Sequence, residues 1–255
     1  MRTRYLDIDD RTEDLVELMR DEPAIAEDFL NKYELSWLYH ENALEGVVYT
    51  AQELELALAN QPLADASTLT AHQEVRNDKA AIDLIRTEAA GKKVRFNVTL
   101  VKRLYETLGT NIEGRNVAEY RRDIPLHRAY FHEIAQPAKI PLLLGKLVDL
   151  CESADFRGAH PLQQASRLQH GFMQIYPFTE NSGKVARLLS NMVLLHHEYL
   201  PCLIHAIDRQ RYYESLRTPE PGLRDLMMEA MDNALANAEK FFQLAMAARA
   251  KKVAR

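Results

Sequence analysis

The sequence predicts an all-α protein, and three observations support that fold class. Apolar residues recur at steps of three and four along most of the 255 residues, which is the spacing of one buried helix face. Only residues 120–141 lack such a stripe. The chain also shows no internal repeat, no low-complexity tract and no interdomain linker, so we expect a single domain over residues 1–255.

The expected helices follow one another along the chain. Early helices are predicted at 10–20, 23–33, 35–45, 51–60, 74–90 and 98–108. Two more helices flank a polar loop; their apolar stripes are Ala165, Leu168, Phe172 and Ile175 before it, and Val185, Leu188, Leu189, Met192 and Leu195 after it. The last helix carries Leu223, Leu226, Met227, Ala230, Ala234, Ala238 and Phe241 at helical spacing.

Residues 120–141 form the exception to the helical pattern. The segment contains Pro125, Pro137 and Pro141 and some alternating apolar residues. Prolines and period-two alternation are typical of a loop or a small β-hairpin. We therefore expect an irregular flap on the helical body.

Composition excludes several classes of function. The formal net charge is −5, whereas nucleic-acid binding usually needs a basic face, so no nucleic-acid partner is expected. No stretch approaches the roughly 18 to 20 apolar residues of a membrane span, and the first residues lack a signal peptide. Cys151 and Cys202 lie in apolar surroundings without a CxxC partner, as in reduced core thiols. These features predict a soluble cytoplasmic protein.

The loop lies within "QIYPFTENSGKVARLL", residues 174–189. A helix N-terminus leaves backbone N–H groups unpaired, and these attract phosphate. Gly183 allows a close approach of the backbone, and Asn181 and Ser182 are good capping residues. Lys184 and Arg187 are three apart and fall on one helix face. The pattern predicts a polyphosphate site.

The same residues allow other interpretations. Glu180 precedes the turn, where it could hold Mg²⁺ beside the phosphates. An ordinary capped helix with surface charges would carry the same residues. A nucleoside-triphosphate P-loop is excluded because it requires a glycine at Phe178 and a hydroxyl residue at Val185.

The stretch "IYPFTENSGKVAR" resembles the signature of the Fic family, Ile-His-Pro-Phe-x-Asp/Glu-Gly-Asn-Gly-Arg-x-x-Arg. The matching positions are Ile175, Pro177, Phe178, Glu180, Gly183 and Arg187. The resemblance implies a Fic-type helical bundle that transfers AMP from Mg-ATP to a protein hydroxyl. It also implies that a flap at 121–141 docks the target protein. Members of the family often form dimers, so a homodimer is compatible with the resemblance.

The resemblance assigns roles to the loop residues. Tyr176 occupies the position of the catalytic base, and Glu180 would hold Mg²⁺. Residues Asn181, Ser182, Gly183 and Lys184 would cradle the α- and β-phosphates. Arg187 would take the γ-phosphate.

A second stretch, "HENALEG" at residues 40–46, resembles the family's inhibitory-helix motif, Ser/Thr-x-x-x-Glu-Gly/Asn. Glu45 and Gly46 match, whereas Glu41 stands where Ser or Thr is expected. The resemblance implies that Glu45 pairs with Arg187 and blocks the γ-phosphate. It divides the chain into N-terminal helices over 1–60, with the inhibitory segment at 35–46, a Fic core over 61–200 and C-terminal helices over 201–255.

Four loop positions depart from the signature. Tyr176 replaces histidine, and a phenol with a pKa near 10 is only about one part in a thousand phenolate at pH 7. Losing a positioned base typically lowers the rate by about 10²- to 10⁴-fold. Asn181, Ser182 and Lys184 replace glycine, asparagine and arginine. His160 and His170 are possible substitute bases, but we expect a packed or helix-surface position for both.

Three hypotheses about function follow from these departures. The first is a weak, altered or Glu45-inhibited adenylyltransferase. The second is a pseudoenzyme that binds a partner through the flap. The third is different phosphate-transfer chemistry on the same scaffold.

Overall fold

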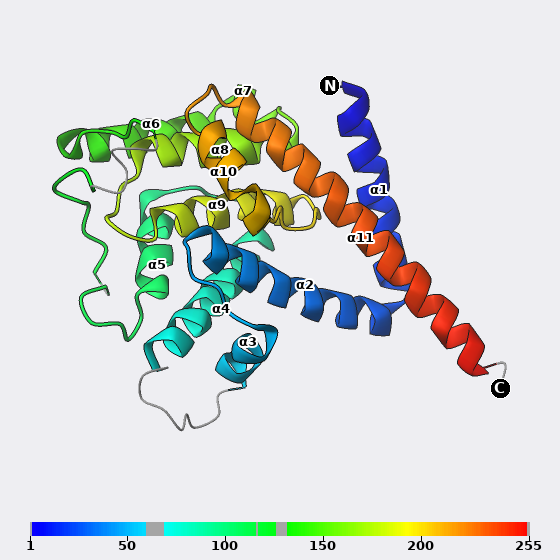
Figure 1. Cartoon of the computed structure of the whole chain (residues 1–255). Coiled ribbons are helices and arrows are strands. Elements are labelled where there is room, and N and C mark those ends of the chain that lie inside the picture. Colours follow the sequence, from blue (N-terminus) through cyan, green and yellow to red (C-terminus); the bar gives the residue numbers. More distant parts are fainter. Residues whose placement is uncertain (1, 60–68, 116, 126–131, 254–255) are drawn as a thin grey trace.

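The computed structural model describes residues 2–59, 69–115, 117–125 and 132–253, and these residues form helices joined by loops, without a β-strand. The all-α fold class predicted from the sequence is therefore confirmed (Figure 1). The helices are, in chain order, α1 Arg2–Asp21, α2 Pro23–Leu44, α3 Ala51–Leu58, α4 Leu69–Ala89, α5 Val98–Leu108, α6 Ile140–Glu152, α7 Ala154–Arg157, α8 Pro161–Ile175, α9 Ser182–His196, α10 Arg209–Ser215 and α11 Pro221–Val253, with 3₁₀ turns at Pro137–Lys139 and Ala206–Asp208.

Helix α9 is the central element of the body. Every residue from Ser182 to Leu194 is buried, because α4, α5 and α8 pack around it. A helix enclosed in this way must satisfy any charge it carries from neighbouring elements. Lys184 and Arg187, which lie in its first two turns, are therefore forced to find partners inside the protein.

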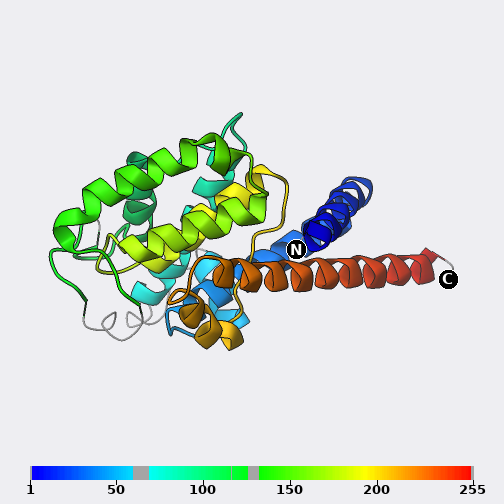
Figure 2. The same ribbon diagram turned by 90° about the horizontal axis from the view of Figure 1, so that it is seen from above.

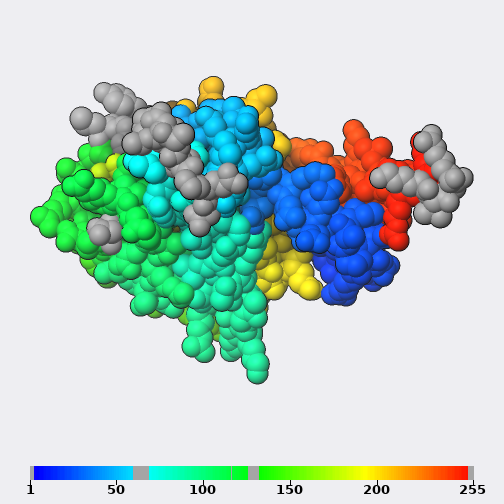
Figure 3. Space-filling model, turned by 90° about the horizontal axis from the view of Figure 1, so that it is seen from below, coloured from blue at the N-terminus to red at the C-terminus, as the bar shows by residue number. Residues whose placement is uncertain are grey.

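The longest helix, α11, extends beyond the body. It packs on α8 and α10, and from Asp232 to Arg249 its side chains pair with α1 and with Glu22 just before α2. Figures 2 and 3 show this part as an arm that projects from the body together with α1. Ion pairs join the two helices of the arm, Arg4 to Asp232 at 2.7 Å and Arg11 to Glu239 at 2.7 Å.

Several details differ from the sequence-based expectations, among them the starts of α1 and α4, which lie eight and five residues before the predicted ones. The helices predicted separately at 23–33 and 35–45 form the single helix α2, since no glycine or proline interrupts the chain after Pro23. Helix α6 begins at Ile140 and thus includes the end of the segment expected to be irregular, because Pro141 occupies the first turn, where proline is tolerated.

The described residues of the flap are irregular rather than helical. Residues 121–125 and 132–136 have no regular secondary structure. Residues 126–131, where a hairpin turn would fall, lie outside the described part of the chain. In the part of the chain that is described, no helix combines the length and the apolarity needed to cross a membrane.

Candidate functional site

The loop between α8 and α9 turns the chain by means of two left-handed residues. Tyr176 ends α8 with φ 46°, and Asn181 precedes α9 with φ 56°. Asparagine adopts this conformation readily, whereas a bulky side chain does so only at a cost in strain. Tyr176 is nonetheless 2% exposed, so its ring is part of the core.

Arg121 fastens the start of the loop to the flap. Its buried guanidinium donates to the backbone carbonyls of Tyr176 at 2.7 Å and Ile175 at 3.2 Å, and also to that of Ala135. Its own backbone N–H donates to Pro177 O at 2.9 Å. No sequence pattern indicates Arg121, since an arginine in an irregular segment carries no periodic signal. Arg121 couples the flap to the position of Tyr176.

The middle of the loop is held from inside. Phe178 is fully buried, and its ring stacks on that of Tyr105 with centroids 4.1 Å apart. The Ser182 hydroxyl accepts from Phe178 N and donates to Phe178 O, both at 2.9 Å. The Ser182 hydroxyl is therefore engaged within the loop. Of its polar groups, the backbone N–H is the one that a helix N-terminus leaves without an intrahelical partner.

Lys184 lies in a buried ion pair. Its Nζ is 2.8 Å from both carboxylate oxygens of Asp78 on α4 and 3.0 Å from Asn42 Oδ1 on α2. Asn42 Nδ2 in turn donates to Asp78 at 2.8 Å. The three side chains are all at most 7% exposed. In this conformation the charge of Lys184 is neutralised by the protein.

The Arg187 guanidinium contacts two carboxylates, that of Glu41 inside α2 and that of Glu45 at the C-cap of the same helix. Its Nε donates to Glu41 Oε1 at 2.7 Å, and its Nη2 lies 2.6 Å from the same oxygen. Nη2 also donates to Glu45 Oε1 at 2.7 Å. The Glu45–Arg187 contact that the inhibitory-helix resemblance implied is therefore present. Glu41, which stands where that motif has a hydroxyl residue, is an additional partner.

Burial and the neighbouring charges shift the pKa values of Glu41 and Arg187 in opposite directions. Burial alone would lower the pKa of Arg187, but Glu41 and Glu45 raise it well above its ordinary value. Burial raises the pKa of the Glu41 carboxyl above its ordinary value, although Arg187 beside it has the opposite effect. For the pKa of Glu41, the effect of burial therefore outweighs the attraction of Arg187 and Lys184, and the like charge of Asp78 adds to the rise.

Replacing Glu41 with glutamine tests this imbalance. A raised folded-state pKa stabilises the protein below the unfolded pKa, and that contribution is lost as the pH rises through the folded pKa. We expect the melting temperature of Glu41→Gln, relative to the wild type, to increase between about pH 4 and pH 7. Thermal unfolding of both proteins in a pH series measures the difference, in which the carboxyl groups outside this cluster cancel. A melting-temperature difference that stays constant or falls as the pH rises would contradict the raised pKa of Glu41.

Gly183 is where Glu45 approaches α9. A Cβ at this position would lie 2.6 Å from Glu45 Oε1 and 3.0 Å from Arg187 Nη1. Such separations are well inside van der Waals contact. The close approach expected from a glycine here is thus made by the Glu45 carboxylate.

A cavity of about 240 Å³ opens beside the loop. Its lining residues are Asn42, Glu45, Val47, Glu74, Asp78, Leu108, Arg115, Tyr176, Thr179, Glu180, Asn181 and Lys184. Arg115 bridges Glu74 at 2.7 Å and Glu180 at 2.6 Å across its wall. Glu180 is half exposed, so it can present one carboxylate oxygen to Mg²⁺ if Arg115 keeps Glu74 as its partner.

The two alternative histidine bases are held elsewhere. His160 Nε2 lies 2.8 Å from Asp9, and its ring stacks on Tyr5. His170 Nε2 lies 2.9 Å from Thr218 O. Neither side chain lines the cavity beside the loop, which agrees with the packed or helix-surface positions expected for both.

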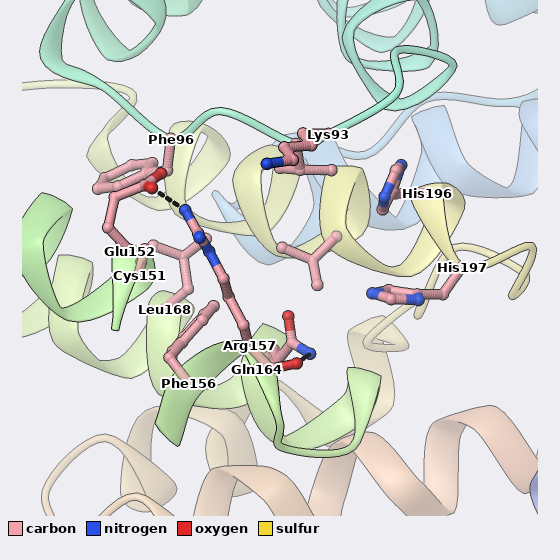
Figure 4. A pocket seen from close by; sticks show the side chains of 12 residues that line it. Lys93, Phe96, Cys151, Glu152, Phe156, Arg157, Gln164, Leu168, His196 and His197 are labelled. Carbon is pink, nitrogen blue, oxygen red and sulfur yellow. Dashed lines mark hydrogen bonds and ion pairs between the residues drawn. The ribbon is translucent and has the colours of Figure 1, made fainter. Parts of the chain in front are cut away.

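A second pocket, of about 200 Å³, lies at the other end of α9 (Figure 4). Phe96, Phe156 and Cys151 form apolar walls, and His196 and His197 lie on one side. Burial raises the pKa of the Cys151 thiol to about 12, so it is not a nucleophile at neutral pH. The charged side chains considered for function therefore lie at the loop end of α9.

The structure thus defines a helical bundle whose buried helix α9 begins at a tight polar loop and carries two cations in its first turns. Residues 95–194 match the Fic/DOC family, and the chain contains a Fic domain. It is 22% identical over 187 residues to the protein adenylyltransferases Fic of Drosophila willistoni and Drosophila grimshawi, covering 72% of this chain. The chain spans about a third of the length of the curated relatives it matches (36% and 38%).

Solved structures share the fold. A Fic domain containing signaling protein from Bacteroides thetaiotaomicron matches with a TM-score of 0.75 and 22% identity, covering 95% of both chains. Fic-1 from C. elegans matches with a TM-score of 0.77 and 17% identity, covering 97% of this chain and 73% of the other. A Fic domain of IbpA in complex with adenylylated Cdc42 matches with a TM-score of 0.53 and 16% identity, covering 82% and 70%.

Proposed function

We propose that this Fic-domain protein binds Mg-ATP at the loop end of α9 and transfers AMP to a protein hydroxyl, in a form weakened by Tyr176 and inhibited by Glu45. The observation that supports the proposal most directly is the Glu45–Arg187 contact of 2.7 Å. An arginine that grips a carboxylate in this way can also grip a phosphate. Glu45 therefore competes with a ligand for the same donor groups.

The reaction would move one group and one proton. The target hydroxyl oxygen attacks the α-phosphorus, the bond between that phosphorus and the bridging oxygen breaks, and diphosphate leaves. The hydroxyl proton must pass to a base, which is the step that a neutral phenol at Tyr176 performs poorly. Mg²⁺, held by Glu180, would supply charge compensation on the phosphates.

The remaining residues would bind rather than react. Backbone N–H groups of residues 182–184 and the Asn181 side chain would contact the α- and β-phosphates. Lys184 would contribute once it exchanges Asp78 for phosphate. Arg187 would take the terminal phosphate once its carboxylate partners withdraw.

The target protein would dock at the flap, residues 121–141. Arg121 fixes the base of this segment to the carbonyl of Tyr176, so a backbone seated on the flap would lie close to the loop. We further propose a cytoplasmic location, where the buried free thiols Cys151 and Cys202 would remain reduced.

The second candidate is a pseudoenzyme that binds a partner through the flap without catalysis. Two observations favour it. Carboxylates neutralise both Lys184 and Arg187, so neither offers a free charge to a ligand, and the side chain of Tyr176 is buried. A third candidate keeps phosphate binding but transfers another phosphate-linked group. Phosphate binding without AMP transfer to any protein would favour this third candidate.

Calorimetric titration of Mg-ATP tests the proposal. The proteins to compare are the wild type and the variants Glu45→Gly, Glu41→Ser and the double variant, each checked for folding by circular dichroism. We expect binding once Arg187 is released from both carboxylates, and loss of that binding on adding Arg187→Ala. A folded double variant that gives no heat would contradict the ATP-dependent function and leave the pseudoenzyme.

A further inference from the structure

Arg187 has two carboxylate partners whose freedom to move differs. The Glu41 side chain is 6% exposed and that of Glu45 is 25% exposed. Glu45 lies just past the last residue of α2, beside Gly46, whose φ of 95° turns the chain away. Glu45 also lines the cavity. Its side chain therefore borders space into which it can rotate, whereas the side chain of Glu41 is enclosed.

Glu41 has no comparable freedom, because it lies inside α2. The last turn of that helix is fastened by α10, where Arg209 Nε donates to Leu44 O at 2.9 Å and Tyr213 Oη donates to the same carbonyl at 3.2 Å. Ala206 N also donates to His40 Nδ1 at 3.2 Å. Moving Glu41 away from Arg187 would mean unwinding a fixed turn or leaving a carboxylate buried without its partner, which is strongly unfavourable.

The donors of Arg187 are therefore unequally available. Nε and Nη2 both contact Glu41, so two of the three nitrogen atoms stay engaged after Glu45 has left. Nη1 is buried and has no hydrogen-bond partner among the described residues. It lies beside Gly183 at the start of α9. A phosphate that displaced only Glu45 would meet the Nη2 N–H that Glu45 had occupied and the N–H groups of Nη1, on a guanidinium whose charge Glu41 already compensates.

We propose that Glu41 is a second carboxylate that keeps Arg187 from a ligand phosphate, so that displacement of Glu45 alone does not open the site. The inference concerns regulation of the site and rests on the proposed function. Glu41 acts through Arg187 and is a positioning residue. Opening the site for a phosphate then requires a change that also withdraws or neutralises Glu41.

Two measurements on variants of Glu41 and Glu45 test this inference. Mg-ATP is titrated into Glu45→Gly and into the double variant Glu41→Ser/Glu45→Gly, with Glu55→Ser/Glu45→Gly as a control because Glu55 is exposed on α3. We expect the double variant to bind at least about tenfold more tightly than Glu45→Gly, since a hydrogen bond between charged groups contributes that much or more. The control should match Glu45→Gly.

The second readout does not depend on ATP. The Nε–Hε resonance of Arg187 should remain protected from solvent exchange in Glu45→Gly and lose protection in Glu41→Ser. If Glu41→Ser does not fold, the isosteric Glu41→Gln replaces it, and exchange should then be faster than in the wild type.

The outcomes distinguish the inferred role of Glu41 from the proposed function. Equal ATP affinity in Glu45→Gly and the double variant would overturn the role of Glu41 while the proposed function stands. No ATP binding in the folded double variant would overturn the proposed function. In that case the Arg187 resonance still decides about Glu41, because protection that survives Glu41→Ser would overturn the inference.

Discussion

Replacing Asp78 with alanine is expected to lower the free energy of unfolding by about 3–5 kcal/mol, the usual result of removing one partner of a buried ion pair. Asp78 accepts from Lys184 and Asn42 and is 3% exposed. Without it, the Lys184 ammonium keeps only the Asn42 oxygen in a buried environment. For a chain of this size the loss corresponds to a melting temperature about 6–20 °C lower, which thermal unfolding followed by circular dichroism measures.

Asp83 on the same helix provides the matched control. It is exposed and pairs with Lys79 at the helix surface, so Asp83→Ala should change stability by no more than about 1 kcal/mol. Replacing both members of the buried pair, as in Asp78→Leu/Lys184→Met, should recover most of the loss, because no charge then remains buried. An Asp78→Ala variant as stable as Asp83→Ala would contradict the buried-pair description.

The loop and its flanking helices could be predicted because their signals are local. Apolar spacing located α8 and α9, and Gly183 marked a close approach that the structure assigns to Glu45. The Glu45–Arg187 contact was also expected, but from a family resemblance and not from the spacing of the two residues. Local patterns and motifs were sufficient wherever the partners lie in one helix or one turn.

The acidic partners inside the body could not be located in the same way. Asp78 and Lys184 are separated by 106 positions, and Arg187 and Glu41 by 146, so only tertiary packing brings them together. One local signal was nevertheless present. Asp78 lies on the buried face of α4 between Val75 and Ile82, and a charged residue on an apolar stripe requires a buried partner.

The boundary inside α2 was mispredicted for a related reason. The stretch from 23 to 44 contains charged residues on several faces, which blurs its apolar stripe. Its end, unlike its start at Pro23, lacks a sharp sequence signal other than Gly46. The continuity of α2 places Glu41 and Glu45 one turn apart over Arg187.

Replacing Tyr176 with histidine is expected to raise AMP transfer by about 10²- to 10⁴-fold in a background with both Glu41 and Glu45 removed, which is the effect of restoring a general base. At pH 7 most of an ordinary imidazole is in the basic form, in contrast to a phenol. Histidine also tolerates the left-handed conformation at this position, φ 46°, better than most large residues. Mass spectrometry of the protein and of added candidate targets after incubation with Mg-ATP detects the transferred AMP.

Tyr176→Phe in the same background is the matched control, since it keeps the buried ring and supplies no base. It should bind Mg-ATP like its parent and transfer no more AMP. If Tyr176→His binds Mg-ATP but transfers nothing above this control, the missing base alone does not account for the absence of transfer. The substitutions at Asn181, Ser182 and Lys184 would then account for it, because Lys184 lacks the planar fork of arginine and the Ser182 hydroxyl is engaged by Phe178.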